Sequence, residues 1–219
     1  MEFSHAALPL LAVTVTALII AEFRGANRAI YVFKPASTSL IIAMAAVGAW
    51  TNGAPDLYGL LVIGGLVLSL GGDAALMPPD TPGRFRLGLA LFLAAHLAYI
   101  VAFWPLSGWA PADILLTVGV AVIAGAFFLV LNPKLGAMRG PVIGYILIIS
   151  LMLNRAVSTL FSGTADPVRA GRIAVGAALF FVSDVILAAN RFWRPWRFHR
   201  LSLAFYFAGQ ASIALSVAA

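Results

Sequence analysis

The segment LYGLLVIGGLVLSLGGDAALM, residues 57–77, has no Lys or Arg and only one charged side chain, Asp73, near its end. Because a helix needs about 20 mainly apolar residues to cross a bilayer, this length predicts a transmembrane helix. The carboxylate is unusual there, since an Asp at the centre of such a helix costs about 2.5–3.5 kcal/mol. A second segment, FFVSDVILAAN at residues 180–190, places Asp184 in the same setting. The function of these two carboxyls is therefore the main question that the sequence raises.

The composition extends the membrane prediction to the whole chain. Of 219 residues, 62% are hydrophobic and 10% are charged, and the mean hydropathy is +1.00. A soluble domain is about half apolar and about a quarter charged. We therefore expect one all-α polytopic membrane domain over residues 1–219. Pro, Gly and charged residues divide it into eight predicted helices, at 6–22, 36–50, 57–77, 86–104, 112–131, 140–160, 169–190 and 199–218.

Basic residues predict the orientation of the bundle. Eleven of the fourteen Lys and Arg residues lie in the connections after the first, third, fifth and seventh predicted helices. By the positive-inside rule these connections are cytoplasmic, so both termini face away from the cytoplasm. The net charge of +6 then reflects orientation rather than a nucleic-acid partner. We expect a multi-pass protein of the bacterial inner membrane, with the first apolar run retained because no basic residue precedes it.

Two segments resemble each other. RLGLALFLAAH (86–96) and RLSLAFYFAGQ (200–210) are identical at five of eleven positions. The predicted helices that precede them, 57–77 and 169–190, each carry one Asp. This pattern suggests two parallel four-helix repeats, as in repeat-built transporters. Chance similarity in an Ala- and Leu-rich chain is the alternative.

Asp73 and Asp184 lie at similar predicted depths, because their helices run in the same direction. Asp73 is four residues before Met77 and Asp184 is six before Asn190, which places both roughly 6–9 Å inside the cytoplasmic ends. They could face one cavity. One interpretation is structural, with each Asp hydrogen-bonded to a neighbouring helix. The other is a coupled pair in which one carboxyl is a protonated acid and the other an ionised base.

Polar residues on several predicted helices favour a hydrated cavity in the cytoplasmic half. Ser69 lies one turn before Asp73, and Ser202, Tyr206 and Gln210 form an i, i+4, i+8 stripe. His96 is ambiguous, since a single mid-helix His is more often an interhelical hydrogen-bonding group than a catalyst. The candidate substrate-binding residues are Lys34, Ser69, His96, Tyr99, Tyr145, Ser183, Asn190, Tyr206 and Gln210.

A metal site is not expected. The chain has no Cys, and its three His residues, His5, His96 and His199, fall at the outer end, the middle and the inner end of the bundle. They cannot converge on one zinc ion, and no cofactor is expected.

Lys34-Pro35 is predicted to begin the second helix, because Pro suits a first helical turn. Lys34 then either sets orientation only or, with the helix-start N–H groups, forms an anion-binding entrance for a lipid phosphate. WRPWRFHR, residues 193–200, is typical of an interfacial Trp/Arg anchor.

At these positions the chain resembles the YhhN family, small polytopic membrane proteins that include the lysoplasmalogenases. The matching elements are KP at 34–35, S-x-x-G-D at 69–73, H-x-x-Y at 96–99, Tyr145, SD at 183–184 and Y-x-x-x-Q at 206–210. The resemblance implies hydrolysis of the vinyl ether bond of lysoplasmalogens, giving a fatty aldehyde and a glycerophospho-ethanolamine or -choline. It also implies that Asp73 and Asp184 are catalytic, and that the partners are an ether lysolipid and membrane lipids.

Two other functions remain open from the sequence. Paired intramembrane acids and a parallel repeat also occur in small-molecule or proton-coupled transporters. A scaffold or lipid-binding protein without catalysis is a third possibility, but it leaves the two carboxyls unexplained.

Overall fold

The computed structural model describes residues 2–51, 53–108, 111–196 and 198–218, with side chains from residue 6 onward. The described residues form eight main helices and no strand, and eight helical segments are apolar and long enough to cross a membrane, the last of them being His199–Ala218, which joins α8 to the short turns on either side of it. The predicted all-α bundle of eight transmembrane helices is therefore confirmed. The long helices are α1 (Glu2–Arg24), α2 (Asn27–Trp50), α3 (Leu57–Ala75), α4 (Pro82–Phe103), α5 (Pro111–Leu131), α6 (Arg139–Ser162), α7 (Pro167–Ala188) and α8 (Ser202–Leu215).

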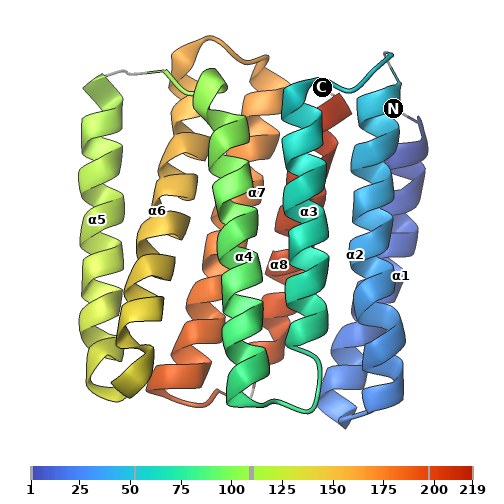
Figure 1. The fold of residues 1–219 in the computed structure, drawn as a ribbon. Coiled ribbons are helices and arrows are strands. Elements are labelled where there is room, and N and C mark those ends of the chain that lie inside the picture. The colour runs from blue at the N-terminus through green and yellow to red at the C-terminus, as the bar shows by residue number, and fades with distance from the viewer. Residues whose placement is uncertain (1, 52, 109–110, 197, 219) are drawn as a thin grey trace.

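Short helical turns extend or connect these helices. They are η1 (Trp104–Leu106), η2 (Asn132–Lys134), η3 (Gly136–Met138), η4 (Ala189–Trp193), η5 (His199–Leu201) and η6 (Ser216–Ala218). Both termini lie at the same end of the bundle (Figure 1). The opposite end carries the α1–α2, α3–α4, α5–α6 and α7–α8 connections, and we call it the basic end because most Lys and Arg residues lie there.

Side-chain caps define several helix starts. Asp56 accepts a hydrogen bond from the backbone N–H of Gly59 at 2.8 Å at the start of α3. Thr81 does the same for α4, and Asp166 for α7. Each cap satisfies a backbone donor that has no partner inside the helix. At the C-terminal end of α6, Gly163 has φ +66°, a left-handed conformation that Gly adopts without steric cost.

The predicted start of the second helix is wrong. α2 begins at Asn27, and Pro35 lies inside it. An internal Pro removes one backbone hydrogen bond, but in transmembrane helices neighbouring groups can compensate for it. The chain instead turns at Gly25, where φ is +64°. Lys34 is therefore not at a helix start, so the anion-binding entrance that relied on helix-start N–H groups is absent.

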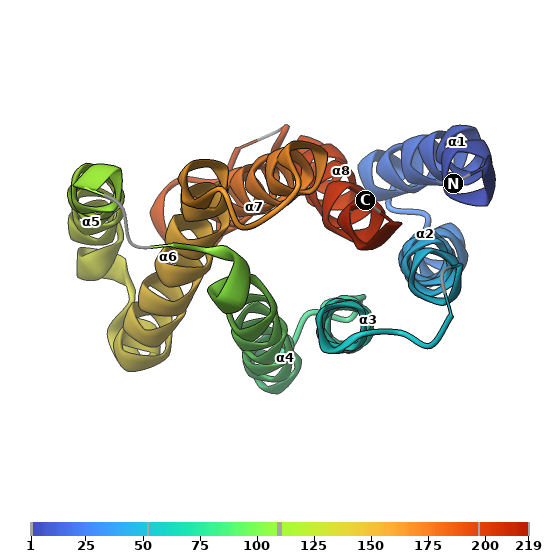
Figure 2. The same ribbon diagram turned by 90° about the horizontal axis from the view of Figure 1, so that it is seen from above.

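The helices pack in the same order in the two halves of the chain. Within each half, consecutive helices pack on one another, most extensively α3 on α4 and α7 on α8. The halves meet through α2 on α8 and α4 on α6. Seen from above, α1 and α5 lie near opposite ends of the bundle (Figure 2). This pattern favours the prediction of two parallel four-helix repeats.

A close helix approach occurs at corresponding positions of both halves. A Cβ atom on Gly65 of α3 would lie 2.4 Å from the ring of Tyr99, and one on Gly176 of α7 would lie 2.6 Å from Ile213. Gly65 and Gly176 are 111 residues apart, as are Asp73 and Asp184. In membranes, small residues allow helices to approach closely in this way.

The positions of α1 and α5 break the symmetry of the halves. α1 packs on α8 as well as on α2, whereas among the described residues α5 makes no comparable contact with α4. Only 11% of the span containing α5 is buried, against 56% for the span containing α8. One side of the second half is therefore less tightly enclosed than the corresponding side of the first.

Candidate functional site

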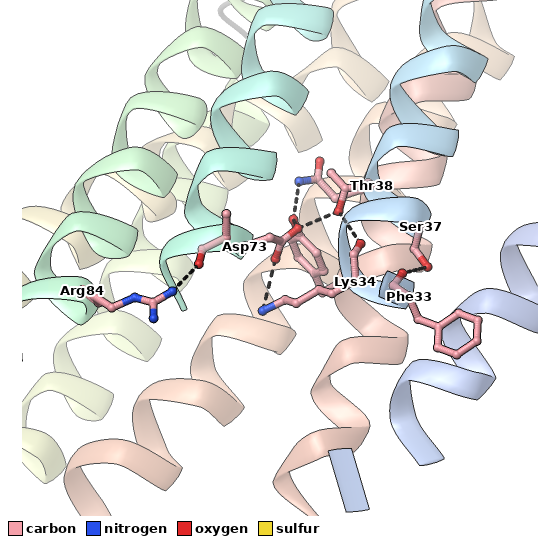
Figure 3. A network of polar contacts seen from close by, with 9 residues as sticks. Phe33, Lys34, Ser37, Thr38, Asp73 and Arg84 are labelled. Atoms are coloured by element: carbon pink, nitrogen blue, oxygen red, sulfur yellow. Dashed lines mark hydrogen bonds and ion pairs between the residues drawn. The ribbon is translucent and has the colours of Figure 1, made fainter. Parts of the chain in front are cut away.

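Asp73 lies near the end of α3 and is surrounded by hydrogen-bond donors from two other helices (Figure 3). Thr38 Oγ1 of α2 and the Tyr206 hydroxyl of α8 donate to its Oδ2 at 2.7 and 2.8 Å. Lys34 Nζ lies 3.5 Å from its Oδ1. Asp73 and Lys34 are both buried. Two hydroxyl donors and an ammonium group together stabilise the ionised carboxylate.

The donors of Asp73 belong to a longer hydrogen-bonded chain. Gln210 Nε2 donates to the Tyr206 oxygen at 3.4 Å, and the Tyr99 hydroxyl donates to Gln210 Oε1 at 2.8 Å. Ser69 lies buried one turn before Asp73 on α3. Through this chain α2, α3, α4 and α8 are linked around one carboxylate, so five of the predicted substrate-binding residues surround Asp73.

Thr38 was not among the predicted site residues. It lies four residues after Lys34, so both side chains occupy one face of α2. The signal was present in the sequence as the i, i+4 spacing of two polar residues. A helix that starts at Pro35 would leave Lys34 outside it, which hides this spacing.

Asp184 of α7 has different neighbours. The Tyr145 hydroxyl of α6 donates to its Oδ2 at 2.6 Å. His96 Nε2 of α4 lies 3.9 Å from the same oxygen, which is too long for a direct hydrogen bond. Neither ring nitrogen of His96 has a hydrogen-bond partner within the described residues, although the side chain is fully buried. Asp184, Tyr145 and His96 thus form a second polar group.

Aromatic rings lie between the two polar groups. Phe180 packs edge-to-face against His96 on one side, with ring centroids 4.7 Å apart, and against Tyr206 on the other, at 5.3 Å. Within the described residues Asp73 and Asp184 share no hydrogen-bond or ion-pair partner. The two carboxyls therefore lie in separate environments.

A narrow cavity of about 70 Å³ adjoins Asp184. It lies between α4, α5, α6 and α7, and Asp73 is not among its lining residues. The expectation that both carboxyls face one cavity therefore does not hold for this cavity. Phe92, Phe127 and Phe181 contribute to its apolar wall, and Arg191 lies at its basic end, where it also pairs with Asp80.

The remaining predicted residues have other surroundings. Ser183 is buried on α7 beside Asp184. Asn190 accepts a hydrogen bond from the backbone N–H of Trp196 at 2.9 Å, so its side chain stabilises the connection after α7. Trp193 and Trp196 are about half exposed there, as an interfacial anchor requires. Arg197 and the side chain of His5 lie outside the described part of the chain.

Comparison with known proteins identifies relatives along most of the chain. The YhhN family model matches residues 29–217. Lysoplasmalogenase TMEM86A of Homo sapiens is 35% identical over 158 residues, which cover 69% of this chain and 62% of the human protein. Lysoplasmalogenase TMEM86B of Homo sapiens is 33% identical over 169 residues, which cover 76% and 67%.

A bacterial relative matches over a longer range. The uncharacterized membrane protein YhhN of Escherichia coli O157:H7 is 28% identical over 207 residues, covering 90% of this chain and 91% of that protein. The chain spans 62% of the length of the TMEM86A proteins that it matches. No solved structure matches the chain.

Proposed function

Because the chain belongs to the YhhN family, we propose that it is a membrane hydrolase that cleaves the vinyl ether bond of lysoplasmalogens. The products would be a fatty aldehyde and a glycerophospho-ethanolamine or -choline. Support comes from the TMEM86A and TMEM86B relatives, which are named lysoplasmalogenases. The observation that carries the proposal is a largely enclosed carboxyl, Asp184, on an apolar cavity with a Tyr and a His beside it.

Vinyl ether hydrolysis requires few functional groups. An acid first protonates the β-carbon of the C=C bond, which leaves an oxocarbenium ion at the carbon attached to oxygen. Water then adds to that carbon and loses a proton to a base. The resulting hemiacetal breaks its C–O bond to the glycerol oxygen, giving the aldehyde and the alcohol.

We assign the acid role to Asp184. An isolated carboxylate is costly to bury in an apolar cavity, so a neutral carboxyl with a single hydroxyl donor suits this position. The Tyr145 hydroxyl donates a hydrogen bond to Asp184 Oδ2, so we assign the transferable proton to Asp184 Oδ1. After the transfer, the Asp184 carboxylate stabilises the neighbouring oxocarbenium ion electrostatically.

The base role follows from the same geometry. His96 Nε2 lies 3.9 Å from Asp184 Oδ2 but does not line the cavity, so the attacking water would reach Asp184 from the cavity side. Asp184, ionised by the first step, then accepts the proton of this water. One carboxyl that acts first as acid and then as base also operates in retaining glycosidases.

Asp73 is assigned a positioning role. Its carboxylate fixes Tyr206, and the Tyr206 ring packs edge-to-face on Phe92, with centroids 5.8 Å apart. Phe92 in turn lines the Asp184 cavity. In this proposal Asp73 therefore acts on catalysis through the wall of the cavity.

The test is aldehyde release by the purified protein in lipid nanodiscs. We expect wild-type protein to cleave alkenyl lysolipids and to leave saturated alkyl ether lysolipids intact, because these have no double bond to protonate. In D₂O the aldehyde should carry one deuterium on the carbon next to the carbonyl, and in H₂¹⁸O the label should enter the aldehyde oxygen. Folded wild-type protein that releases no aldehyde from any alkenyl lysolipid would refute the proposal.

A further inference from the structure

The contacts between α5 and α6 at the end of the bundle opposite the basic end are polar. Asn154 Nδ2 of α6 donates to Thr117 Oγ1 of α5 at 2.9 Å. Ser158 Oγ of α6 donates to Asp113 Oδ1 of α5 at 2.6 Å. These two hydrogen bonds hold the first turns of α5 against α6.

At the basic end the two helices are joined by an apolar cluster. Leu131 at the end of α5, Leu135 in the connection and Val142 at the start of α6 are buried together. Phe127, Phe128 and Ile146 pack against them. α5 is therefore fixed to α6 at both ends by contacts of different chemistry.

Between these two contacts the helices leave a slot of about 540 Å³. The wall on α5 includes the small residues Ala121, Ala124 and Gly125, with Val120 and Phe128 beside them. The wall on α6 is largely apolar and includes Ile143, Leu147 and Leu151, and the polar residues Asn154 and Arg155 line the end of the slot farthest from the basic end. This volume lies within the range of about 300–1,000 Å³ that is typical of small-molecule sites.

The slot borders the Asp184 cavity. Ala124 and Ile146 line both spaces. Ile146 also follows Tyr145, whose hydroxyl binds Asp184. From Ile146 to Arg155 the helix rises about 14 Å, close to the roughly 15 Å of hydrocarbon in one bilayer leaflet. The slot is thus about as long as one lipid chain.

In the first half of the chain, the helix that corresponds to α5 is packed differently. There α1 packs on both α2 and α8. Ser37 of α2 donates to Thr14 Oγ1 of α1 at 2.9 Å near this contact. α5 lacks the contact with α4 that would correspond to α1 on α8 in the described residues. The slot therefore lies beside the carboxyl that lines a cavity.

We propose that the slot between α5 and α6 binds the single hydrocarbon chain of the lysolipid. The Asp184 cavity, at about 70 Å³, is too small to hold such a chain itself. The vinyl ether would lie at Asp184, the headgroup would point past Arg191 toward the basic end, and the chain would extend toward Asn154. The polar residues at that end limit the chain length. This inference rests on the proposed function for the identity of the lipid.

Two glycines of α5 provide a matched pair of variants. A Cβ added at Gly125, which lines the slot, or at Gly119, which does not, would meet no atom within 4 Å. Gly125→Leu should therefore fill the slot without disturbing the fold. We expect it to lower kcat/KM at least tenfold for alkenyl lysolipids of about 16 carbons and to preserve activity on chains of about 8 carbons. Gly119→Leu should leave both activities within about twofold of wild type.

Binding of a lysolipid chain in the slot can also be measured without catalytic turnover. A saturated alkyl lysolipid with a diazirine near its chain end should label α5 and α6 of wild type and Gly119→Leu, but not of Gly125→Leu. Excess lysolipid should suppress this labelling and a diacyl phospholipid should not.

The outcomes separate the two proposals. Labelling that depends on the slot, without any aldehyde release, would support binding of the lipid chain in the slot and refute the proposed hydrolase activity. Suppose instead that both variants release aldehyde with the same chain-length preference and are labelled equally. This result would refute binding of the chain in the slot and would support the proposed hydrolase activity. Equal competition by a diacyl lipid would show that the slot holds any membrane chain, which also overturns the inference.

Discussion

Asp73 and Asp184 are identical residues in opposite environments. Asp73 accepts hydrogen bonds from Thr38 and Tyr206 and pairs with Lys34. Asp184 accepts from Tyr145 and lines an apolar cavity. Since unpaired buried charge is costly, the first position favours a carboxylate and the second a neutral acid. The difference between the two carboxyls therefore comes from their neighbours.

Replacing Asp184 by Asn should remove activity and preserve the fold. The amide has nearly the same shape and its oxygen can still accept from Tyr145, but it cannot donate a proton to carbon. Loss of a general acid typically costs about 10²–10⁴-fold in rate, so we expect aldehyde release to fall by at least about 100-fold with little change in Tm.

Asp166→Asn is the control for this substitution. Asp166 caps α7 at its exposed start, and Asn caps helices about as well as Asp. Its activity and Tm should match those of wild type. Asp184→Asn protein with normal turnover would exclude Asp184 as the acid.

The Lys34–Asp73 pair should behave as a unit in stability measurements. Lys34→Met or Asp73→Asn alone leaves an uncompensated buried charge, which typically costs about 3–5 kcal/mol. The double variant Lys34→Met/Asp73→Asn removes both charges, so it should unfold at a higher temperature than either single variant. Thermal unfolding in one detergent measures all four proteins, and additive effects would contradict the direct pairing.

The same close packing at a glycine occurs in two pairs of helices. α3 and α4 meet closely at Gly65, and α7 and α8 meet at Gly176, where a side chain on either glycine would clash. Lipid chains are as apolar as Leu, so transmembrane helices associate through close packing and polar contacts rather than by avoiding water. Glycine at these positions therefore contributes directly to helix association.

Adjacent glycines of α3 test this packing. A Cβ on Gly65 would lie 2.4 Å from the Tyr99 ring, whereas one on Gly64 would meet no atom within 4 Å. Gly65→Leu should destabilise the protein by at least about 1–3 kcal/mol, the usual cost of overpacking. Gly64→Leu should be near neutral. Equal Tm values for the two variants would mean that α3 and α4 are farther apart than in this structure.

Both termini lie at one end of the bundle (Figure 1), and most basic residues lie in or near the connections at the other end. The positive-inside rule predicts that the basic end faces the cytoplasm. Asp184 and Asp73 would then lie in the cytoplasmic half, and the lysolipid would enter from the inner leaflet.

Single cysteines can measure this orientation, because the natural chain has none. Ala26 in the α1–α2 turn and Thr164 between α6 and α7 are exposed at opposite ends. A membrane-impermeant maleimide should label Thr164→Cys in intact spheroplasts and Ala26→Cys only after permeabilisation. The reverse pattern would place the basic end outside.

The number of helices, their approximate bounds and the depth of each carboxyl along its helix could be predicted from the sequence. These depend on the length of apolar runs and on the rise per residue, which are properties of the local chain. The start of α2 was missed because Pro35 is compatible with both a first turn and a tolerated interior position.

The sequence alone determined an eight-helix membrane bundle with two intramembrane carboxyls at similar depth. Only the tertiary structure decided that LVLSLGGDAALM places Asp73 against Lys34, Thr38 and Tyr206, and that Asp184 alone lines the cavity. It also decided that α5 leaves a slot beside α6. The reason is that lipid-facing and buried faces of these helices are equally apolar. Periodicity therefore cannot show which face of a helix meets which neighbour.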